Sequence, residues 1–179
     1  QNQAPSANVT GANDRLVVGF VGVGGQGMAH VRSIKRNAND NNVAIAAVCD
    51  VSKTRRAEAA QYVGDGTDSY NDHRELTERK DIDVVVVSTV DHWHSPVGID
   101  AMQSGKHVYC EKPMTRYLGE AFEMYDVSKS TGMKVQVGAQ RTTSGAYHKA
   151  AELNREGMIG RPVLATGSYM RNNPNGEWN

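Results

Sequence analysis

The sequence has no surplus of charge of either sign and no long apolar run. Its 20 basic residues balance 20 acidic ones, and no Lys/Arg-rich run is present. Non-specific nucleic-acid binding needs a basic surface that displaces counterions. A bilayer-spanning helix needs roughly 20 apolar residues, whereas the longest apolar run, around Val84 to Val87, is strand-sized. We therefore expect no nucleic-acid partner and no membrane association.

Cysteine is also scarce, since Cys49 and Cys110 are the only two and each ends a predicted strand. In the strand order proposed below they lie three strands apart, which is roughly 14 Å at about 4.8 Å per strand. A disulfide needs Cα atoms about 4.4–6.8 Å apart. We expect two free, packed thiols, which say nothing about the redox compartment.

What is present is typical of a soluble globular chain, with 39% hydrophobic and 22% charged residues. The 179 residues suit one domain plus a fragment of a second, because domains usually run about 100–200 residues. Residues 1–14 are polar and turn-prone, which indicates a flexible leader. The first residue is Gln rather than Met, and either a cleaved export signal or a trimmed chain leaves such a start. We slightly favour an exported, periplasmic protein over a cytoplasmic one.

Strand-like and helix-like segments alternate over residues 15–139, which indicates a parallel sheet with helical crossovers. The β-branched run at 83–88 is typical of a central strand covered on both faces. The expected strands are 15–23, 43–49, 68–70, 83–88, 107–110 and 133–137. The expected helices are 25–37, 52–62, 71–79, 95–104 and 115–131. The pattern predicts an α/β Rossmann domain, a doubly wound parallel sheet with strand order 3-2-1-4-5-6.

Several residues mark the expected helix ends. Ser52 is suited to cap the second helix, and Pro96 suits the first position of a helix opened by Ser95. Gly105 and Gly132 are expected to end the helices that precede them.

After Gly138 the pattern restarts. Tyr147 to Glu156 predicts a helix, and 161–171 predicts a strand that begins another sheet. One helix and one strand cannot bury both of their apolar faces unaided. We therefore interpret residues 140–179 as the start of an α+β substrate and oligomerisation domain that is incomplete in this chain.

The segment Gly22-Val23-Gly24-Gly25-Gln26-Gly27 matches a dinucleotide fingerprint. A glycine triplet alone is weak evidence, and a ligand-free turn is the alternative. This one follows a strand, opens a helix and precedes Asp50, which lies 23 positions after Gly27 at a second strand end. Gly22 permits the tight turn, Gly24 lets the backbone approach a pyrophosphate, and Gly27 lets the helix pack on the strand.

The N-terminus of that helix offers unpaired N–H groups and a positive dipole end to the phosphates. Asp50 is expected to accept hydrogen bonds from the adenosine ribose hydroxyls. A carboxylate there repels a 2′-phosphate, which favours NAD. Three basic residues just beyond it can accommodate that phosphate, so NADP stays an alternative: Lys53, Arg55 and Arg56.

Two further polar segments follow predicted strands, at the edge where open α/β sheets bind ligands. They are Ser88-Thr89-Val90-Asp91-His92-Trp93-His94 and Glu111-Lys112-Pro113. The strand order predicts that both lie beside the nicotinamide end of a dinucleotide. Lys112 is a candidate acid/base, because desolvation and cationic neighbours lower the pKa of a lysine. Trp93 is expected to cover the cofactor, and His94 to hydrogen-bond to it or to substrate.

Other interpretations of these residues exist. His92 and His94 beside Asp91 can form part of a metal site, but no third spaced ligand accompanies them, so we expect no metal. Lys112 can also be a solvated surface lysine, as most lysines are. Four remaining histidines have no evident partner and are interpreted as structural or exposed: His30, His73, His107 and His148.

With these motifs in order, the chain resembles the Gfo/Idh/MocA oxidoreductases, relatives of glucose–fructose oxidoreductase and inositol dehydrogenase, over about residues 15–171. Glu111-Lys112-Pro113 is the most specific mark, and the resemblance implies that Lys112 is catalytic. It also implies that Gln140 lies near the nicotinamide and that Arg141 and Tyr169 face substrate. The expected cofactor-contacting set is Gly22, Gly24, Gly25, Gln26, Gly27, Met28, Asp50, Ser88, Thr89, Asp91, His92, Trp93, His94, Glu111, Lys112 and Gln140.

The resemblance implies an NAD(P)-dependent oxidoreductase of a sugar, cyclitol or related polyol, with Lys112 as acid/base. It implies a homo-oligomer formed through the substrate-domain sheet of the full-length protein. Family members complete the catalytic group with an Asp/His pair from a longer substrate domain, so these 179 residues alone are expected to bind cofactor without turnover. One alternative is an NAD-dependent glycosidase that oxidises its sugar transiently, and another is a non-catalytic nucleotide-binding protein.

Overall fold

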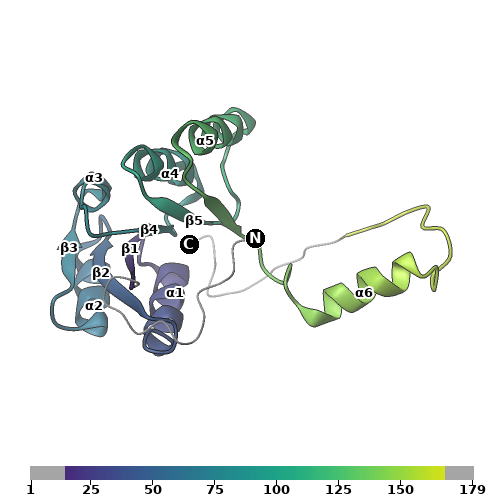
Figure 1. Ribbon diagram of the computed structural model, residues 1–179, viewed down its shortest axis with the longest axis horizontal. Helices are drawn as coiled ribbons and strands as arrows, with labels where there is room; N and C mark the ends of the chain where they lie inside the picture. Colours follow the sequence, from purple (N-terminus) through teal and green to yellow (C-terminus); the bar gives the residue numbers. More distant parts are fainter. Residues whose placement is uncertain (1–14, 168–179) are drawn as a thin grey trace, which may run out of the picture. The chain divides into compact units, whose positions relative to one another are not determined.

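The computed structural model describes residues 15–167, which divide into two units between Ala139 and Gln140. The first unit is built on a six-stranded sheet of order β3-β2-β1-β4-β5-β6, in which every neighbouring pair is parallel (Figure 1). The strands are β1 (Leu16–Val21), β2 (Val43–Cys49), β3 (Asp68–Tyr70), β4 (Val84–Val87), β5 (His107–Glu111) and β6 (Val135–Gly138). The predicted Rossmann strand order is confirmed.

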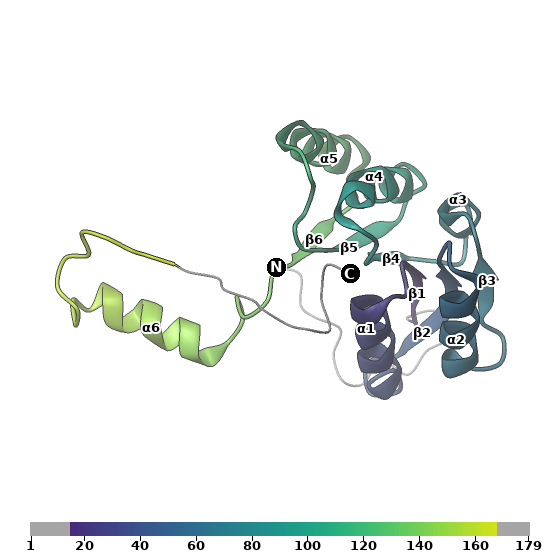
Figure 2. The same cartoon turned by 180° about the vertical axis from the view of Figure 1, so that it is seen from behind.

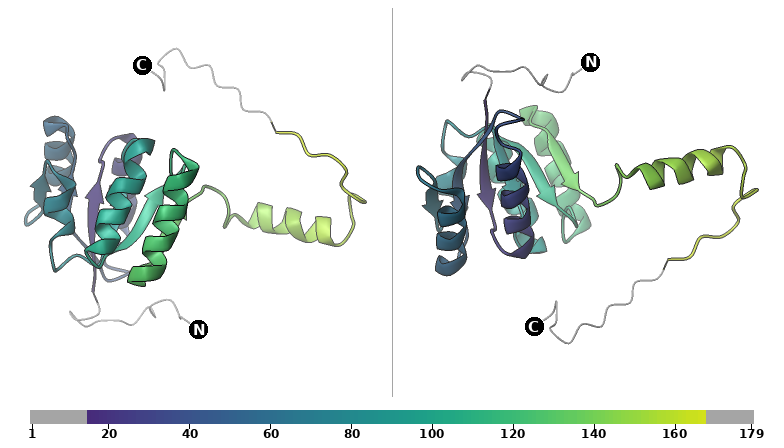
Figure 3. Two further views of the ribbon diagram at one scale, coloured as in Figure 1. Left: turned by 90° about the horizontal axis from the view of Figure 1, so that it is seen from above. Right: turned by 90° about the horizontal axis from the view of Figure 1, so that it is seen from below.

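Helices cover both faces of this sheet (Figures 1 and 2). One face carries α1 (Gly25–Arg36) and α2 (Lys53–Val63). The other carries α3 (His73–Thr77), α4 (His94–Gln103) and α5 (Leu118–Thr131). Figure 3 shows α4 and α5 side by side against the strands. Because helices cover both faces of the sheet, the edge at the carboxyl ends of its strands stays open, and loops and helix N-termini line it.

The core consists of two apolar clusters, one on each side of the sheet. Phe20 and Val86 pack with α1 and α2, whereas Val85, Val87 and Val108 pack with α3, α4 and α5. Alternate residues of a strand point to opposite faces, so the consecutive valines of β4 contribute to both clusters. This explains why the central strand is a continuous β-branched run rather than an alternating one.

The helix ends agree with the predicted signals except before α4 and α5. Ser52 caps α2 through a bond from the Arg55 backbone N–H at 3.5 Å, and Gly132 ends α5 with φ +74°. The helix α4 begins at His94, directly after a 3-10 helix η2 (Asp91–Trp93), so Pro96 is its third residue rather than its first. Proline is tolerated there because the first N–H groups of a helix have no intrahelical acceptor.

The start of α5 is three residues later than predicted. Tyr117 is extended, and Glu120 bends back to accept the backbone N–H groups of Arg116 and Tyr117, each at 3.0 Å. This bond pattern fixes the helix start at Leu118.

Cys49 and Cys110 are buried and free, as predicted. Burial raises the pKa of each thiol to about 12, with the nearby carboxylates of Asp50 and Glu111 adding to the shift. Both therefore belong to the packed interior beside the site rather than to its reactive surface.

The second unit contains α6 (Gly145–Arg155), close to the predicted helix. The predicted strand is wrong over the part that can be assessed, because residues 161–167 form no ladder with any described strand. Val163 and Leu164 are exposed there, and a strand forms only where a partner accepts its backbone bonds. Tyr169 and the leader, 1–14, lie outside the described residues. Within residues 15–167, no helix is both long and apolar enough to cross a membrane.

Candidate dinucleotide-binding site

Four polar or glycine positions form one row along the carboxyl edge of the sheet. Val21 pairs with Cys49 on one side and Val87 on the other, and Val87 pairs with Cys110. The residues that follow these four are therefore aligned: Gly22, Asp50, Ser88 and Glu111. The helix that follows β1 (α1) and the helix that follows its neighbour β4 (α4) lie on opposite faces of the sheet. The carboxyl edge between these two strands is therefore the topological switch point where open α/β sheets bind ligands.

The fingerprint turn is as tightly packed as predicted. Gly22 has φ +84°, and a Cβ there would lie 2.6 Å from the backbone of Ser88. A Cβ at Gly27 would lie 2.0 Å from the carbonyl oxygen of Gly22. Side chains at either position would push α1 and the end of β4 away from β1.

The N-terminus of α1 fits a dinucleotide pyrophosphate. Gly24 provides no capping side chain, and the first turn carries no acidic residue. A Cβ at Gly25 would meet nothing within 4 Å, so the unbonded N–H groups of this turn are accessible to an anion. Among the described residues, the Ser88 hydroxyl alone is a buried side-chain polar group without a protein partner, and it adjoins this turn. A bound pyrophosphate would accept hydrogen bonds both from the Ser88 hydroxyl and from the uncapped N–H groups of α1.

Met28 belongs to the helix rather than to the phosphate-binding surface. Its backbone N–H donates to Gly24 at 2.8 Å, and its side chain packs on the apolar cluster under α1 and α2. That N–H is therefore not available to a phosphate, and the expected contact of Met28 with the cofactor stays a prediction.

Asp50 is 9% exposed and both of its carboxylate oxygens are bonded to backbone. Oδ2 accepts the N–H of Val23 at 2.9 Å, and Oδ1 accepts that of Ser52 at 2.8 Å. Each oxygen retains acceptor capacity, so ribose hydroxyls can still bind there. Asp50 thus holds the fingerprint turn, and its contact with the ribose stays a prediction.

The three basic residues after Asp50 differ in their surroundings. Arg56 donates to the Asp50 carbonyl at 2.6 Å and to Asn71 at 3.1 Å, so its guanidinium is already engaged. The Arg55 guanidinium lies beside Gly24, 3.5 Å from where a Cβ would be. Lys53 is exposed. Arg55 is therefore the cation best placed toward the phosphate-binding turn.

His94 does not face the site, and its expected contact with cofactor or substrate is wrong. The residue is 1% exposed, its Nδ1 lies 2.7 Å from the Pro113 carbonyl, and its Nε2 lies 3.1 Å from the Thr89 carbonyl. As the first residue of α4 it turns inward beneath the loop. It connects the loop after β4 with the loop after β5, in which the Lys112–Pro113 bond is cis.

The loop after β4 is half-buried at Thr89 and exposed from Val90 to Trp93. Thr89 donates its hydroxyl to the next carbonyl at 3.1 Å, and Asp91 accepts the N–H of His92 at 2.9 Å. Trp93 is 46% exposed, and its ring contacts His92 and, edge-on, His73. Among residues 15–167, no group of three or more His, Cys, Asp or Glu side chains is arranged to hold a metal ion.

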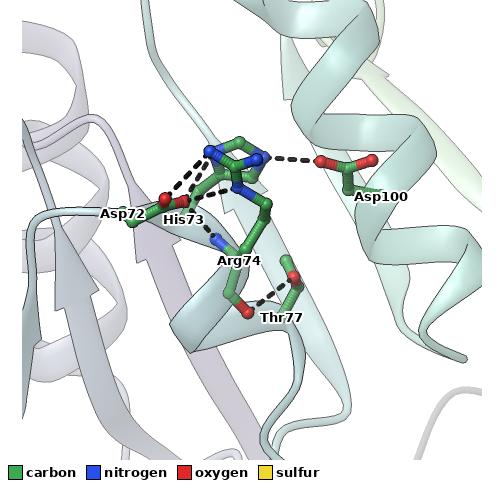
Figure 4. A network of polar contacts seen from close by, with 5 residues as sticks. All are labelled: Asp72, His73, Arg74, Thr77 and Asp100. Carbon is green, nitrogen blue, oxygen red and sulfur yellow. Dashed lines mark hydrogen bonds and ion pairs between the residues drawn. The ribbon is translucent and has the colours of Figure 1, made fainter.

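Figure 4 shows a polar network between α3 and α4, which includes the His73 ring that contacts Trp93. His73 of α3 lies 2.7 Å from Asp100 of α4. Asp72 caps α3 by accepting the Arg74 backbone N–H at 3.0 Å. Its hydrogen bonds from Arg74 lower the pKa of Asp72 to about 2. The network ties two helices together beside an aromatic side chain at the rim of the site.

Glu111 is buried and connects β5 with α1. Its Oε1 lies 2.7 Å from Nε2 of His30 and accepts from the Gln26 amide at 3.3 Å, while Oε2 accepts the Lys112 backbone N–H at 3.1 Å. The side chain of Lys112 is exposed, and residues 15–139 do not enclose it. The motif glutamate therefore links the fingerprint helix to the lysine.

The sequence interpretation missed His30, which it treated as structural or exposed. Gln26 and His30 lie four residues apart, so they share one face of α1. That spacing, on a helix expected to begin at the carboxyl edge of the sheet, was the available signal. Gln140 and Arg141 are exposed in the second unit, and Arg141 has φ +69°. Their roles, and that of Tyr169, stay predictions.

A Rossmann dinucleotide-binding domain is defined by four features that occur together here: the fold, the fingerprint turn, the acidic residue after β2 and the open N-terminus of α1. A family model described as an oxidoreductase family with an NAD-binding Rossmann fold, GFO_IDH_MocA, matches residues 16–139. The chain belongs to this family, and the resemblance seen in the motifs is confirmed.

Known relatives cover most of this chain. It is 28% identical over 155 residues to inositol 2-dehydrogenase of Salmonella paratyphi B, covering 86% of this chain and 46% of that protein. It is 34% identical over 165 residues to a glycosyl hydrolase family 109 protein of Shewanella pealeana, and the match covers 88% of this chain and 36% of that protein. The structure of a levoglucosan dehydrogenase in complex with NADH superposes with a TM-score of 0.71 at 30% identity, over 82% of this chain and 41% of that chain. The chain spans less than half the length of each.

Proposed function

We propose that these residues form the cofactor-binding part of an NAD-dependent oxidoreductase that oxidises a hydroxyl of a sugar, cyclitol or related polyol. The observation that carries the proposal is the row at the carboxyl edge of the sheet, in which Lys112 follows Glu111 beside the fingerprint turn. Two relatives whose names are those of dehydrogenases of polyhydroxylated rings support it. The same proposal includes a homo-oligomer formed through the substrate-domain sheet of the full-length protein.

The cofactor is held both by charged side chains and by backbone N–H groups. The uncapped N–H groups of α1 receive the pyrophosphate, and Asp50 accepts the adenosine ribose hydroxyls. The buried carboxylate of Asp50 repels a 2′-phosphate, which favours NAD over NADP. Arg55 beside Gly24 adds positive charge near the phosphates.

Lys112 is the group proposed to move the proton. Oxidising an alcohol to a ketone removes one proton from oxygen and one hydride from carbon, two electrons in all. Bound NAD supplies the hydride acceptor. The neutral Nζ of Lys112 takes the hydroxyl proton, which requires a hydrogen-bonding approach of roughly 2.6–3.2 Å in the complex.

A second candidate is an NAD-dependent glycosidase, which the family 109 relative specifically favours. In that reaction the sugar is oxidised, eliminates its substituent and is reduced again, so the cofactor is regenerated within each cycle. The same Lys112 would move the proton. The two functions therefore differ in the net fate of the cofactor rather than in this site.

Full-length protein incubated with excess NAD and a panel of sugars and cyclitols tests the proposal. Stoichiometric NADH formation, followed by absorbance, is the expected result. Release of an aglycone from a chromogenic glycoside without NADH accumulation would instead identify the glycosidase. Absence of both reactions, in a protein shown by calorimetry to bind NAD, would contradict an enzymatic role and favour a nucleotide-binding protein.

A further inference from the structure

On each side of Lys112, the neighbouring residue contacts a histidine from a different helix. Before the lysine, Glu111 is bonded to His30 of α1 at 2.7 Å. After it, the Pro113 carbonyl lies 2.7 Å from Nδ1 of His94 at the start of α4. These two helices lie on opposite faces of the sheet, so the lysine segment is fixed from both sides.

The direction of the His30 bond follows from its neighbours. Nε2 of His30 lies 3.2 Å from the Gln26 amide nitrogen and 2.7 Å from Glu111 Oε1. The carboxylate is only an acceptor, so the 2.7 Å contact needs a hydrogen on Nε2, and the Gln26 amide then donates to Glu111 Oε1 at 3.3 Å rather than to His30. Glu111 then accepts the Lys112 backbone N–H through its other oxygen at 3.1 Å. The side chain of Glu111 is 7% exposed, which leaves water little access to replace these donors.

The other histidine, His94, is the more deeply buried of the two. His94 is 1% exposed and its Nε2 lies 3.1 Å from the Thr89 carbonyl, at the end of β4. The helix it begins buries Val97 and Ala101 in the core. Its ring therefore transmits the position of α4 and β4 to the Pro113 carbonyl.

We propose that His30 and His94 are positioning residues that fix the backbone of Lys112 relative to the fingerprint helix. The inference rests on the proposed function, because it assumes that Lys112 moves the proton. Gln26 contributes both to Glu111 and to the turn that receives the phosphates. One hydrogen-bonded chain thus joins cofactor binding and the lysine, and a displacement of about 1 Å is enough to lower a rate about 10²-fold.

The role of His30 is tested by measuring, by NMR, the hydrogen exchange of the Lys112 backbone amide in the full-length protein. His30→Leu removes the donor, whereas His30→Gln keeps an amide nitrogen near the position of Nε2. We expect Lys112 exchange to be about tenfold faster in His30→Leu and within about threefold of wild type in His30→Gln. Exchange is normalised to the Val86 amide in the central strand.

Arg79→Ala is the matched control. Arg79 pairs with Asp68 and Asp81 near the opposite edge of the sheet, so its loss lowers stability without touching Lys112. Equal Lys112 exchange in His30→Leu and wild type, or an equal normalised rise in Arg79→Ala, would overturn the proposal.

Kinetics and calorimetry complete the test. In His30→Leu we expect a kcat reduced about 10²-fold with NAD affinity within about threefold. His94→Asn retains a nitrogen near Nδ1, so it should recover most of the kcat lost in His94→Leu. Equal losses of kcat in His94→Asn and His94→Leu would overturn the positioning role of His94. If wild type oxidises no polyol yet His30→Leu still accelerates Lys112 exchange, the proposed function fails and the positioning stands.

Discussion

The Asp50 carboxylate accepts the backbone N–H of Val23 at 2.9 Å, in the middle of the fingerprint turn. The acidic residue expected to bind ribose is therefore also a structural part of the turn that binds phosphate. Because one buried group serves both, its removal should disturb both halves of the adenosine site.

Asp50→Ala should weaken NAD binding by about 1–3 kcal/mol and also lower the free energy of unfolding, because two backbone N–H groups lose their acceptor. Calorimetry and urea denaturation measure the two effects. Asp83→Ala is the matched control, since Asp83 accepts the Val17 N–H at 2.8 Å near the opposite edge of the sheet. It should cost stability without changing NAD affinity. Unchanged NAD affinity in Asp50→Ala would contradict the ribose assignment.

Gly27→Ala should destabilise the domain by more than about 2 kcal/mol and abolish measurable NAD binding, because the new methyl would lie 2.0 Å from the Gly22 carbonyl. Thermal unfolding with and without NAD measures both. Gly119→Ala in α5 provides the comparison, since its methyl meets nothing within 4 Å. That variant should unfold at the same temperature or slightly higher. A Gly27→Ala protein with normal NAD-induced stabilisation would exclude the close packing of α1 on β1.

Lys112→Met in the full-length enzyme should lower kcat by about 10²–10⁴-fold, with much less effect on the dissociation constant of NAD. Steady-state rates and NAD titrations of both proteins measure the two effects. Parallel losses of rate and NAD affinity would assign Lys112 an electrostatic role in cofactor binding instead.

Stability should fall as the pH rises from about 9 to about 12, because the pKa of Cys49 and Cys110 is raised from 9.0 to about 12 by burial. The unfolded thiols lose protons first, so their contribution is complete below pH 9 and declines through that window. Urea denaturation at several alkaline pH values measures the slope. Cys110→Ala should give a shallower decline than wild type. Rapid alkylation of either thiol in the native protein at neutral pH would contradict their burial.

The strand order and the helix–strand alternation were predictable from local patterns. The valine run at 83–88 indicates a strand covered on both faces, and the glycine turn with Asp50 indicates the first two strands. Crossovers between parallel strands have one hand, so these few elements restrict the topology to the observed one. That Lys112 follows a strand on the binding edge came from the same reasoning.

Side-chain directions within the site were not predictable in this way. The sequence placed His94 at the correct edge, but the direct passage from η2 into α4 turns its ring inward. It treated His30 as having no partner, whereas the structure brings that ring to a carboxylate 81 residues away. Nothing in the sequence indicated that Asp50 accepts the backbone N–H groups of Val23 and Ser52.

Local patterns along the chain were enough to identify the Rossmann class, the edge of the sheet that carries the candidate site and the candidate lysine, because periodicity and turn chemistry are local properties. The groups that hold this lysine and the fingerprint turn became evident only from the packing of helices and strands. Hydrogen bonds such as His30 to Glu111 and Val23 to Asp50 join residues distant along the chain. Their existence depends on how helices and strands pack within a few ångströms, which no local pattern specifies.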